Sequence, residues 1–383
     1  MSEEKQKNPV KKEIMRMPAE IRFSDQLEAL KSIDEGDKPE SWYLSPSRVN
    51  DFIVGREEPI KMKKGNKTVE VFITRKFYGN DIMIQRAIAS LLSDRPLLLI
   101  GEPGTAKSWL SENLTAAICN NSLNVIQGTA GTTEDQIKYS WNYASLIANG
   151  PSLEALVPAP FYNCMKRGEI VRFEEITRCS HEIQDTIISI LSDKVLAIPE
   201  LPPPNDIVFA QKGFGVIGTA NTRDRGVNEM SSALKRRFNF ETVHPIKNIK
   251  EEIELVSKET EIFLEKAGIK RQPDLDVIEL IVTTFNEMRN GISAEGIQVA
   301  KPSVVMSTAE AVEVSVNSAM YSHYIKNEDM NANSAVINLV GSVVKDNYED
   351  LDKLRSYFNV IIKKKAEDKG KLWANYYDAR DYI

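Results

Sequence analysis

Apolar and polar positions alternate in two different ways along the chain, and the change comes near residue 245. Before it, short apolar runs are separated by stretches with helical periodicity. The first run, residues 96–100, ends at a glycine, and helical patterns precede it over 81–93 and follow it over 108–119. A buried strand, a glycine turn and a helix in this order are typical of the start of a parallel α/β unit.

Further short apolar runs continue this pattern, and we interpret them as strands of the same sheet. They lie at residues 124–127, 169–173 and 214–219, with a helical stretch over 181–191 between the last two. Strands that alternate with helices predict a parallel sheet covered by helices on both faces. An extended stretch at residues 68–74 lies outside this alternation.

Two hairpins are expected as insertions between these strands. One spans residues 138–148, and the other pairs 195–198 with 207–210 across the proline-rich loop 199–206. The tips at 141–143 and 199–206 are candidates for contact with a substrate, although ordinary packing or an exposed loop explains the same pattern.

After residue 245 only helical periodicity is found, which predicts a second, all-helical domain. The expected helices are residues 251–267, 275–289, 304–323, 334–344 and 352–366. The chain then divides into a mobile polar tail (1–18), an N-terminal segment of unassigned role (19–75), an α/β core with two inserts (76–245) and a helical domain (246–383).

The composition narrows the class of protein. A length of 383 residues suggests two or three domains. The formal net charge of −6 disfavours a general nucleic-acid coat protein, which usually carries a basic surplus.

The three cysteines (Cys119, Cys164 and Cys179) have no CxxC spacing, so neither a disulfide framework nor a zinc site is expected. The charged N-terminus lacks the apolar region of a secretory signal and no run is long enough to span a membrane, so we expect a cytoplasmic location without membrane contact.

The first candidate for chemistry is the glycine turn after residue 100. Residues 101–108 read GEPGTAKS and fit the phosphate-loop pattern G-x-x-x-x-G-K-[ST], except that Ala106 replaces the last glycine. Backbone N–H groups at a helix N-terminus bind phosphate, Lys107 would reach the β- and γ-phosphates, and Ser108 would bind Mg²⁺. The alternative, a chance match in an ordinary turn, is disfavoured by the strand before it and the helix after it.

Ala106 leaves two alternatives open, because alanine tolerates positive φ poorly. Either the local φ is negative or strain is stored there. In and next to this loop, the predicted nucleotide contacts are Gly101, Glu102, Pro103, Gly104, Thr105, Ala106, Lys107, Ser108 and Trp109.

A second candidate is the strand that reads EIVRFEE over residues 169–175. An apolar strand that ends in two acids suits a nucleotide site, so we assign Glu174 to Mg²⁺ and Glu175 to the attacking water. Aspartate is more usual at the metal position. A lone charge at Arg172 is costly within a strand, but Arg172 and Glu174 share a face and are candidates for an ion pair. The plainer alternative is an acidic strand end that faces solvent.

Polar residues also follow the next strand. Residues 216–221 read VIGTAN and deliver Asn221 to the carboxyl edge, where it would position water, although asparagine is also a common turn residue. In LKRRF, Arg236 and Arg237 are candidates for an arginine that acts on a neighbouring subunit's phosphates. Arg223 and Arg225 are secondary candidates, and a basic helix end is the alternative for each.

Together, GEPGTAKS, VRFEEITR, GTANTRDRG and SSALKRRF resemble the MoxR group of AAA+ ATPases in order and spacing. The segment GTTEDQIKYSWN resembles that group's threonine-acid motif. The resemblance is strong over about residues 75–245 and weak over the helical remainder, and within the group it is closest to the YehL-type branch. It implies an α/β fold: a P-loop AAA+ parallel sheet with flanking helices, followed by a smaller all-α lid.

The resemblance also implies a function: a hexameric ring that hydrolyses ATP with Mg²⁺ at subunit interfaces, remodels proteins as a chaperone does, and works with von Willebrand factor A domain proteins. Lys107 and Ser108 are then the P-loop pair, and Glu174 and Glu175 are the Walker B pair. Asn221 is sensor 1, and Arg237 or Arg236 is the arginine finger. The lid's sensor 2 arginine has no clear match, and Lys301 in VAKPS is the nearest candidate.

Two other interpretations remain open. NTRDRG and ALKRRF also resemble the McrB restriction GTPases, which would make the chain a nucleic-acid-directed GTPase motor; the acidic balance counts against this. The substituted Ala106 and Glu174 and the missing sensor 2 arginine also fit a nucleotide-gated scaffold that hydrolyses little.

Overall fold

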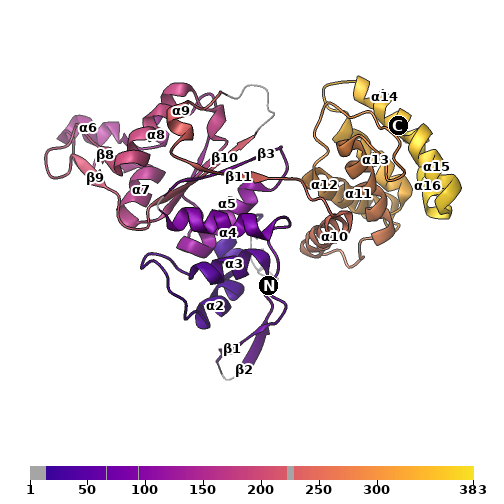
Figure 1. The fold of residues 1–383 in the computed structure, drawn as a ribbon, viewed down its shortest axis with the longest axis horizontal. Helices are drawn as coiled ribbons and strands as arrows, with labels where there is room; N and C mark the ends of the chain where they lie inside the picture. Colours follow the sequence, from indigo (N-terminus) through magenta and orange to yellow (C-terminus); the bar gives the residue numbers. More distant parts are fainter. Residues whose placement is uncertain (1–13, 66, 94, 222–227) are drawn as a thin grey trace, which may run out of the picture.

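The structure is a computed structural model that describes residues 14–383 except 66, 94 and 222–227. Figure 1 shows a central lobe built on the sheet, a hairpin that projects below it, and a helical lobe to the right. The two strands of the projecting hairpin belong to the N-terminal segment, and the helical lobe holds the C-terminus.

The central sheet has five parallel strands in the order β11-β3-β10-β7-β4. Their bounds are β3 (Leu97–Gly101), β4 (Val125–Gln127), β7 (Ile170–Glu174), β10 (Gly215–Asn221) and β11 (Asn239–Val243). Asn221 lies opposite Gly101, and Gln127 lies opposite Glu174, so the carboxyl ends of these strands meet at one edge. That edge is where ligands of open α/β sheets bind.

Both faces of the sheet are covered, which explains why its strands read as continuous apolar runs. Successive residues of β3 enter different cores: Leu97 and Leu99 pack on one face, and Leu98 packs on the other. The covering helices are α4 (Asp81–Leu92), α5 (Lys107–Cys119), α7 (Pro160–Arg167), α8 (His181–Asp193) and the short α9 (Ser232–Lys235).

The edge strand β11 was not expected from the sequence. It pairs with β3 at the edge of the described sheet, and its burial alternates, with Phe240 exposed and Glu241 buried. A half-buried strand with polar residues lacks the all-apolar signature of the interior strands.

The N-terminal segment is part of the core rather than a separate unit. Its elements are α1 (Ala19–Arg22), α2 (Ser24–Ser32), α3 (Pro46–Val54) and the antiparallel pair β1 (Ile60–Lys64) and β2 (Lys67–Val71). Leu27 and Phe52 share one hydrophobic core with Leu110 of α5. The predicted mobile tail is too long, because Arg16 forms an ion pair of 2.6 Å with the buried Glu112; residues 1–13 lie outside the described part.

The two inserts lie between strands of the sheet, and one differs from its prediction. The expected hairpin 138–148 is wrong: β5 (Tyr139–Trp141) pairs with β6 (Leu156–Pro158), and α6 (Tyr143–Asn149) lies between them. The second hairpin is confirmed, with β8 (Val195–Ala197) paired to β9 (Ile207–Phe209). The hydroxyl of Tyr139 donates to Glu200 over 3.0 Å, so the two inserts contact each other.

The helical domain has its own hydrophobic core. Its helices are α10 (Ile249–Lys266), α11 (Leu275–Asn290), α12 (Thr308–Met320), α13 (Ala332–Val343), α14 (Glu349–Tyr357), α15 (Lys363–Lys369) and α16 (Lys371–Asp378), with π-helical turns at Tyr321–Lys326 and Phe358–Ile362. The predicted start at residue 304 is too early, because a capping box between Ser307 and Glu310 begins α12 at Thr308. Within the described residues, every helix is too short or too polar to cross a bilayer.

Candidate nucleotide-binding site

The loop between β3 and α5 has the backbone of a phosphate cradle. Ala106 has φ 63° and ψ 27°, in the left-handed region, and α5 begins at the next residue. Of the two alternatives for this position, the strained one therefore holds. A non-glycine residue in this region costs about 1–3 kcal/mol, and such strain is concentrated at functional sites.

Gly104 is required where the helical domain meets this loop. It has φ +74°, and a Cβ there would lie 2.3 Å from the Cβ of Ser307. Ser307 is the N-cap of α12, so the start of this helix rests on the loop. A narrow cavity at the contact is lined by Pro103, Gly104, Thr105, Pro245, Arg289, Val305, Ser307 and Thr308.

Lys107 is buried at the base of the loop. Its Nζ donates to the carbonyl oxygens of Gly101 (3.2 Å) and Glu102 (2.8 Å). A buried ammonium can exchange these carbonyl oxygens for phosphate oxygens, which carry full charge.

Glu174 lies at the centre of a cluster of donors, with only 3% of its surface exposed. Its Oε2 accepts hydrogen bonds from the hydroxyls of Ser108 (2.6 Å) and Thr219 (2.7 Å). Its Oε1 accepts from Arg172 (2.9 Å) and from the hydroxyl of Ser111. A hydroxyl beside a carboxylate oxygen is the kind of oxygen donor set that binds Mg²⁺, so Ser108 and Glu174 fit the predicted metal role.

The expected pairing of Arg172 with Glu174 is present in the structure. Arg172 is 8% exposed, and its Nη2 lies 2.9 Å from Oε1 of Glu174. The cost of burying this arginine in a strand is therefore offset by a buried counter-ion.

Glu175 lies at the same edge in a strained backbone conformation, with φ 55°. Asn221 Nδ2 donates to both oxygens of its carboxylate, over 2.9 and 3.0 Å, and Arg178 Nε lies 3.4 Å from Oε2. Glu175 N donates to the Thr219 hydroxyl over 3.0 Å. The structure thus brings together the residues predicted for phosphate, metal and water: Lys107, Ser108, Glu174, Glu175 and Asn221.

The two candidate finger arginines differ in their surroundings. The Arg237 guanidinium donates to the Ser192 hydroxyl of α8 and to the Ala233 carbonyl, so it folds back on its own chain. Arg236 is exposed; its backbone N–H donates to the Ser232 carbonyl over 3.2 Å, and its carbonyl oxygen accepts from Arg95 over 2.6 Å. The secondary candidates Arg223 and Arg225 lie outside the described residues.

Two predicted nucleotide contacts have other neighbours. Trp109 donates from Nε1 to the Lys76 carbonyl over 2.7 Å, and its ring packs against Phe23, so it serves the N-terminal segment. Lys301 packs its methylenes beside Gly291 at the end of α11.

Sequence reasoning missed Arg289, the buried arginine that the helical domain presents to the loop. It lines the narrow cavity, forms an ion pair of 2.8 Å with Glu252, and donates to the Met306 carbonyl. A lone arginine in the apolar sequence of α11 was the available signal.

Thr219 was also missed, although it precedes Asn221 by two residues and therefore shares its strand face.

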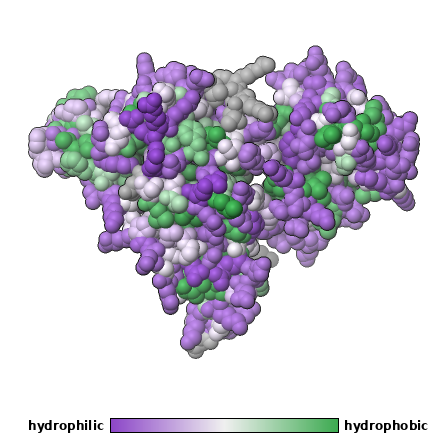
Figure 2. Space-filling model, viewed as in Figure 1, coloured by the Kyte–Doolittle hydropathy of each residue, from purple (hydrophilic) through white to green (hydrophobic). Residues whose placement is uncertain are grey.

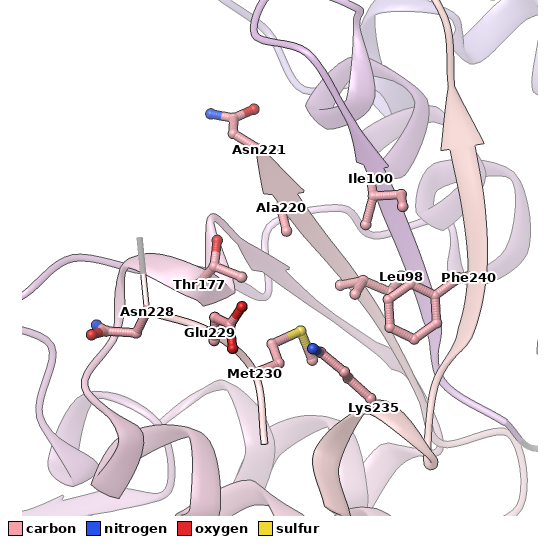
Figure 3. A pocket seen from close by; sticks show the side chains of 10 residues that line it. All are labelled: Leu98, Ile100, Thr177, Ala220, Asn221, Asn228, Glu229, Met230, Lys235 and Phe240. Atoms are coloured by element: carbon pink, nitrogen blue, oxygen red, sulfur yellow. The ribbon is translucent and has the colours of Figure 1, made fainter. Parts of the chain in front are cut away.

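A pocket of about 270 Å³ lies behind Asn221, on the side of the sheet where α9 lies (Figure 3). Leu98, Ile100, Ala220 and Phe240 form its apolar wall, and Lys235 reaches across it from α9. The pocket touches the predicted nucleotide residues through Asn221 alone among its described lining residues. It is therefore distinct from the phosphate cradle.

Comparison with known proteins matches the two parts of the chain separately. Residues 96–238 match the family described as AAA domain (dynein-related subfamily). Residues 250–383 match the YehL-like AAA+ ATPase C-terminal domain. The core and the helical lid thus correspond to two family domains in this order.

Individual relatives cover different shares of the chain. The protein YehL of Escherichia coli (strain K12) is 43% identical over 374 residues, which are 97% of this chain and 99% of YehL. Midasin of Giardia intestinalis is 30% identical over 173 residues, 43% of this chain but 4% of midasin.

Among solved structures, the RuvB Holliday junction branch migration motor of Thermotoga maritima has a TM-score of 0.42 at 15% identity, covering 79% of this chain and 87% of that one. NtrX of Brucella abortus in complex with ADP has a TM-score of 0.46 at 12% identity, covering 79% and 69%.

Proposed function

The chain belongs to the YehL-like family of AAA+ ATPases, and from this premise we propose that it hydrolyses MgATP to remodel protein partners. The observation that carries the proposal is the meeting of three strand ends at the phosphate loop. There the hydroxyl of Ser108 lies 2.6 Å from Glu174, and Asn221 holds Glu175.

Each residue has a distinct part in this chemistry. The backbone of the loop and Lys107 bind the phosphates, and Ser108 with Oε2 of Glu174 would hold Mg²⁺. When bound, Mg²⁺ would supply positive charge that neutralises the negative charge of the phosphates. Glu175 accepts a proton from the attacking water, and Asn221 orients the carboxylate that does so.

The proposal includes a ring, which is tested through the arginines that would act across its interfaces. An arginine from a neighbouring subunit stabilises the charge that develops on the transferred phosphate. The resemblance to MoxR proteins favours a hexamer, with Arg236 and Arg237 as the candidates for this role.

The inserts are the proposed contact with protein partners. Tyr143 and Ile147 of α6 are 68% and 85% exposed, and Phe209 of β9 is 63% exposed. Figure 2 shows a mostly polar surface with apolar patches, one of them at the end of the molecule where α6, β8 and β9 lie. Exposed apolar side chains at a projecting end are typical of protein contacts. We propose a protein with a von Willebrand factor A domain as the partner, on the MoxR resemblance.

Phosphate release from ATP and GTP, with and without DNA, tests this function. We expect ATP turnover without DNA, and we expect Glu175→Gln to lower it by about 100-fold because the general base is lost. Glu182→Gln, on the exposed surface of α8, is the matched control.

Other outcomes favour the alternatives. A preference for GTP that DNA stimulates would support the McrB-like motor. A negligible rate that Glu175→Gln leaves unchanged would support a nucleotide-gated scaffold.

The arginines are tested by separating binding from hydrolysis. We expect Arg237→Ala to lower kcat by about 1,000-fold while leaving ATP affinity nearly unchanged, because a finger acts on transition-state charge. A loss of this size in Arg236→Ala alone would assign the finger to the exposed arginine instead. Arg167→Ala is the control. Arg167 is the last residue of α7, and it forms an ion pair with Glu169, which follows that helix.

A further inference from the structure

Arg172 is the most unusual residue near the nucleotide site, because it is a buried cation inside the strand that delivers both acids. Each nitrogen of its guanidinium has an acceptor: Nε donates to the Ser111 hydroxyl (3.1 Å), Nη1 to the Ser122 carbonyl (3.1 Å), and Nη2 to the Ser108 carbonyl (3.2 Å) and Glu174 (2.9 Å). The guanidinium is thus fixed in place between α5 and β7.

The two carboxylate oxygens of Glu174 have different environments as a result. Oε1 faces Arg172, and Oε2 faces the hydroxyls of Ser108 and Thr219. Arg172 therefore bonds to Oε1 of Glu174. Oε2 lies on the side of Ser108, where the two side chains would hold a metal ion together.

In the described part of this edge, each of the two carboxylates lies beside a cation. Arg172 lies 2.9 Å from Glu174, and Arg178 lies 3.4 Å from Glu175. A free divalent cation entering here meets a carboxylate that already has a counter-ion, and the like charge of Arg172 opposes it. A nucleoside triphosphate brings the negative charge that makes a divalent cation favourable.

We propose that Arg172 is a built-in counter-ion of the metal-binding carboxylate, so that Mg²⁺ enters together with the nucleotide rather than as a free ion. Arg172 acts through Glu174 and is a positioning residue. This inference rests on the proposed MgATP site and adds a binding order to it.

The position of Arg172 is tied to the N-terminal segment. Its partner Ser122 is buried, and the carboxylate of Glu20 in α1 accepts from both the backbone N (3.1 Å) and the hydroxyl (2.7 Å) of Ser122. A chain of hydrogen bonds thus runs from α1 through Ser122 and Arg172 to Glu174. This gives the N-terminal segment a part in positioning the counter-ion.

The test measures metal binding without nucleotide, with Mn²⁺ as the probe and electron paramagnetic resonance of the free ion as the readout. We expect wild type to bind Mn²⁺ weakly and Arg172→Met to bind it at least about tenfold more tightly, because the opposing charge is gone. Mg²⁺ should then raise the Tm of Arg172→Met more than that of wild type.

Companion variants separate charge from packing. Arg172→Lys keeps the charge and should resemble wild type, whereas Arg172→Met/Glu174→Gln removes both charges and should lose the gain. Arg172→Gln, which removes the charge but keeps a donor, should show the same gain and replaces Arg172→Met if that variant does not fold. Arg86→Met breaks the Arg86–Glu241 ion pair at the edge strand and should leave Mn²⁺ binding unchanged.

The outcomes are decisive in both directions. Unchanged or weaker Mn²⁺ binding in Arg172→Met and Arg172→Gln overturns the inference and leaves Arg172 as part of the packing. The same gain in Arg86→Met or in the double variant also overturns it. The proposed function is judged separately, by binding of a fluorescent ATP analogue to wild type in EDTA and in Mg²⁺: its absence refutes the nucleotide site, whatever Mn²⁺ does.

Discussion

Two buried clusters of acids and bases, one at the nucleotide site and one in the lid, use similar chemistry in different places. In the core, Glu174 accepts from Arg172 and from the hydroxyls of Ser108, Ser111 and Thr219. In the lid, Glu287 accepts from Lys365 (2.7 Å), from the Tyr357 hydroxyl (2.6 Å) and from a backbone N–H. Burial and hydrogen bonding therefore do not by themselves distinguish a functional cluster from a structural one.

Location makes the difference between them. The core cluster lies where strands end beside a phosphate loop, and one of its donors, Ser108, belongs to that loop. The lid cluster closes on itself: Lys365 also contacts Glu295 over 3.0 Å, which ties α15 to α11 and to the turn after it. Burial and the Glu287 charge raise the pKa of Tyr357 well above its usual value, so its hydroxyl stays a donor. The comparison predicts a loss of stability when a buried cation is removed from the lid and a loss of nucleotide binding when one is removed from the nucleotide site.

The largest expected effect is on stability, in the lid. Lys365→Met leaves Glu287 without its buried counter-ion and should lower the free energy of unfolding by about 3–5 kcal/mol. Hydrogen exchange of α11 and α15 would locate the loss, and Lys364→Met, on the exposed side of α15, is the control. A large loss of nucleotide affinity in folded Lys365→Met would break the comparison.

The next effect is on binding, in the core. Lys107→Ala should weaken binding of a labelled ATP analogue by at least about 100-fold, or about 2.7 kcal/mol, because the phosphates lose a buried cation. The Tm of the variant without nucleotide, measured alongside, separates a loss of binding from a loss of folding. Lys212→Ala is the exposed control, and undiminished binding in Lys107→Ala would contradict the assignment.

The smallest expected effect is on the pH dependence of stability, and it tests whether the lid cluster has a structural role. Burial alone would raise the pKa of Glu295, but hydrogen bonds from Lys365 and Lys369 outweigh it and lower this pKa to about 2. A lowered carboxyl pKa contributes stability above the unfolded value of 4.5, and this contribution is lost as pH falls from 4.5 towards 2.

Because Glu295 is partly exposed, we expect the loss to be about 1 kcal/mol. Glu295→Gln should flatten the pH dependence of lid unfolding in this range, whereas the exposed Glu279→Gln should keep it. If the pH dependence of lid unfolding in Glu295→Gln is the same as in wild type, carboxylates other than Glu295 cause it.

Much of the site was predictable because its motifs are local. The phosphate loop, the paired acids and Asn221 each follow a short apolar strand, and parallel strands bring their carboxyl ends together whatever their order. The pairing of Arg172 with Glu174 followed from the two-residue period of a strand. Trp109 could not be assigned in this way, because its partners Phe23 and Lys76 lie far from it in sequence.

The missed elements share a physical cause. The strand β5 pairs with β6, and a helix lies between them in the sequence. Nothing in the local sequence therefore argued against the hairpin that we expected there. The edge strand β11 is half-buried, and its polar residues hide it from a search for apolar runs. The lid meets the phosphate loop at Ser307 and Arg289, whereas the sequence favoured Lys301, because the approach depends on how the lid folds back on the core.

The sequence by itself determined that a triphosphate loop, two acids and a polar strand end occur in the order of an AAA+ core, since each depends on neighbouring residues and on strand periodicity. Only the tertiary structure decided that Arg172 bonds to one particular carboxylate oxygen of Glu174. It also decided how α1 is connected to that arginine and which part of the lid covers the loop. Those contacts join residues that are distant along the chain, and their geometry follows from packing rather than from local sequence.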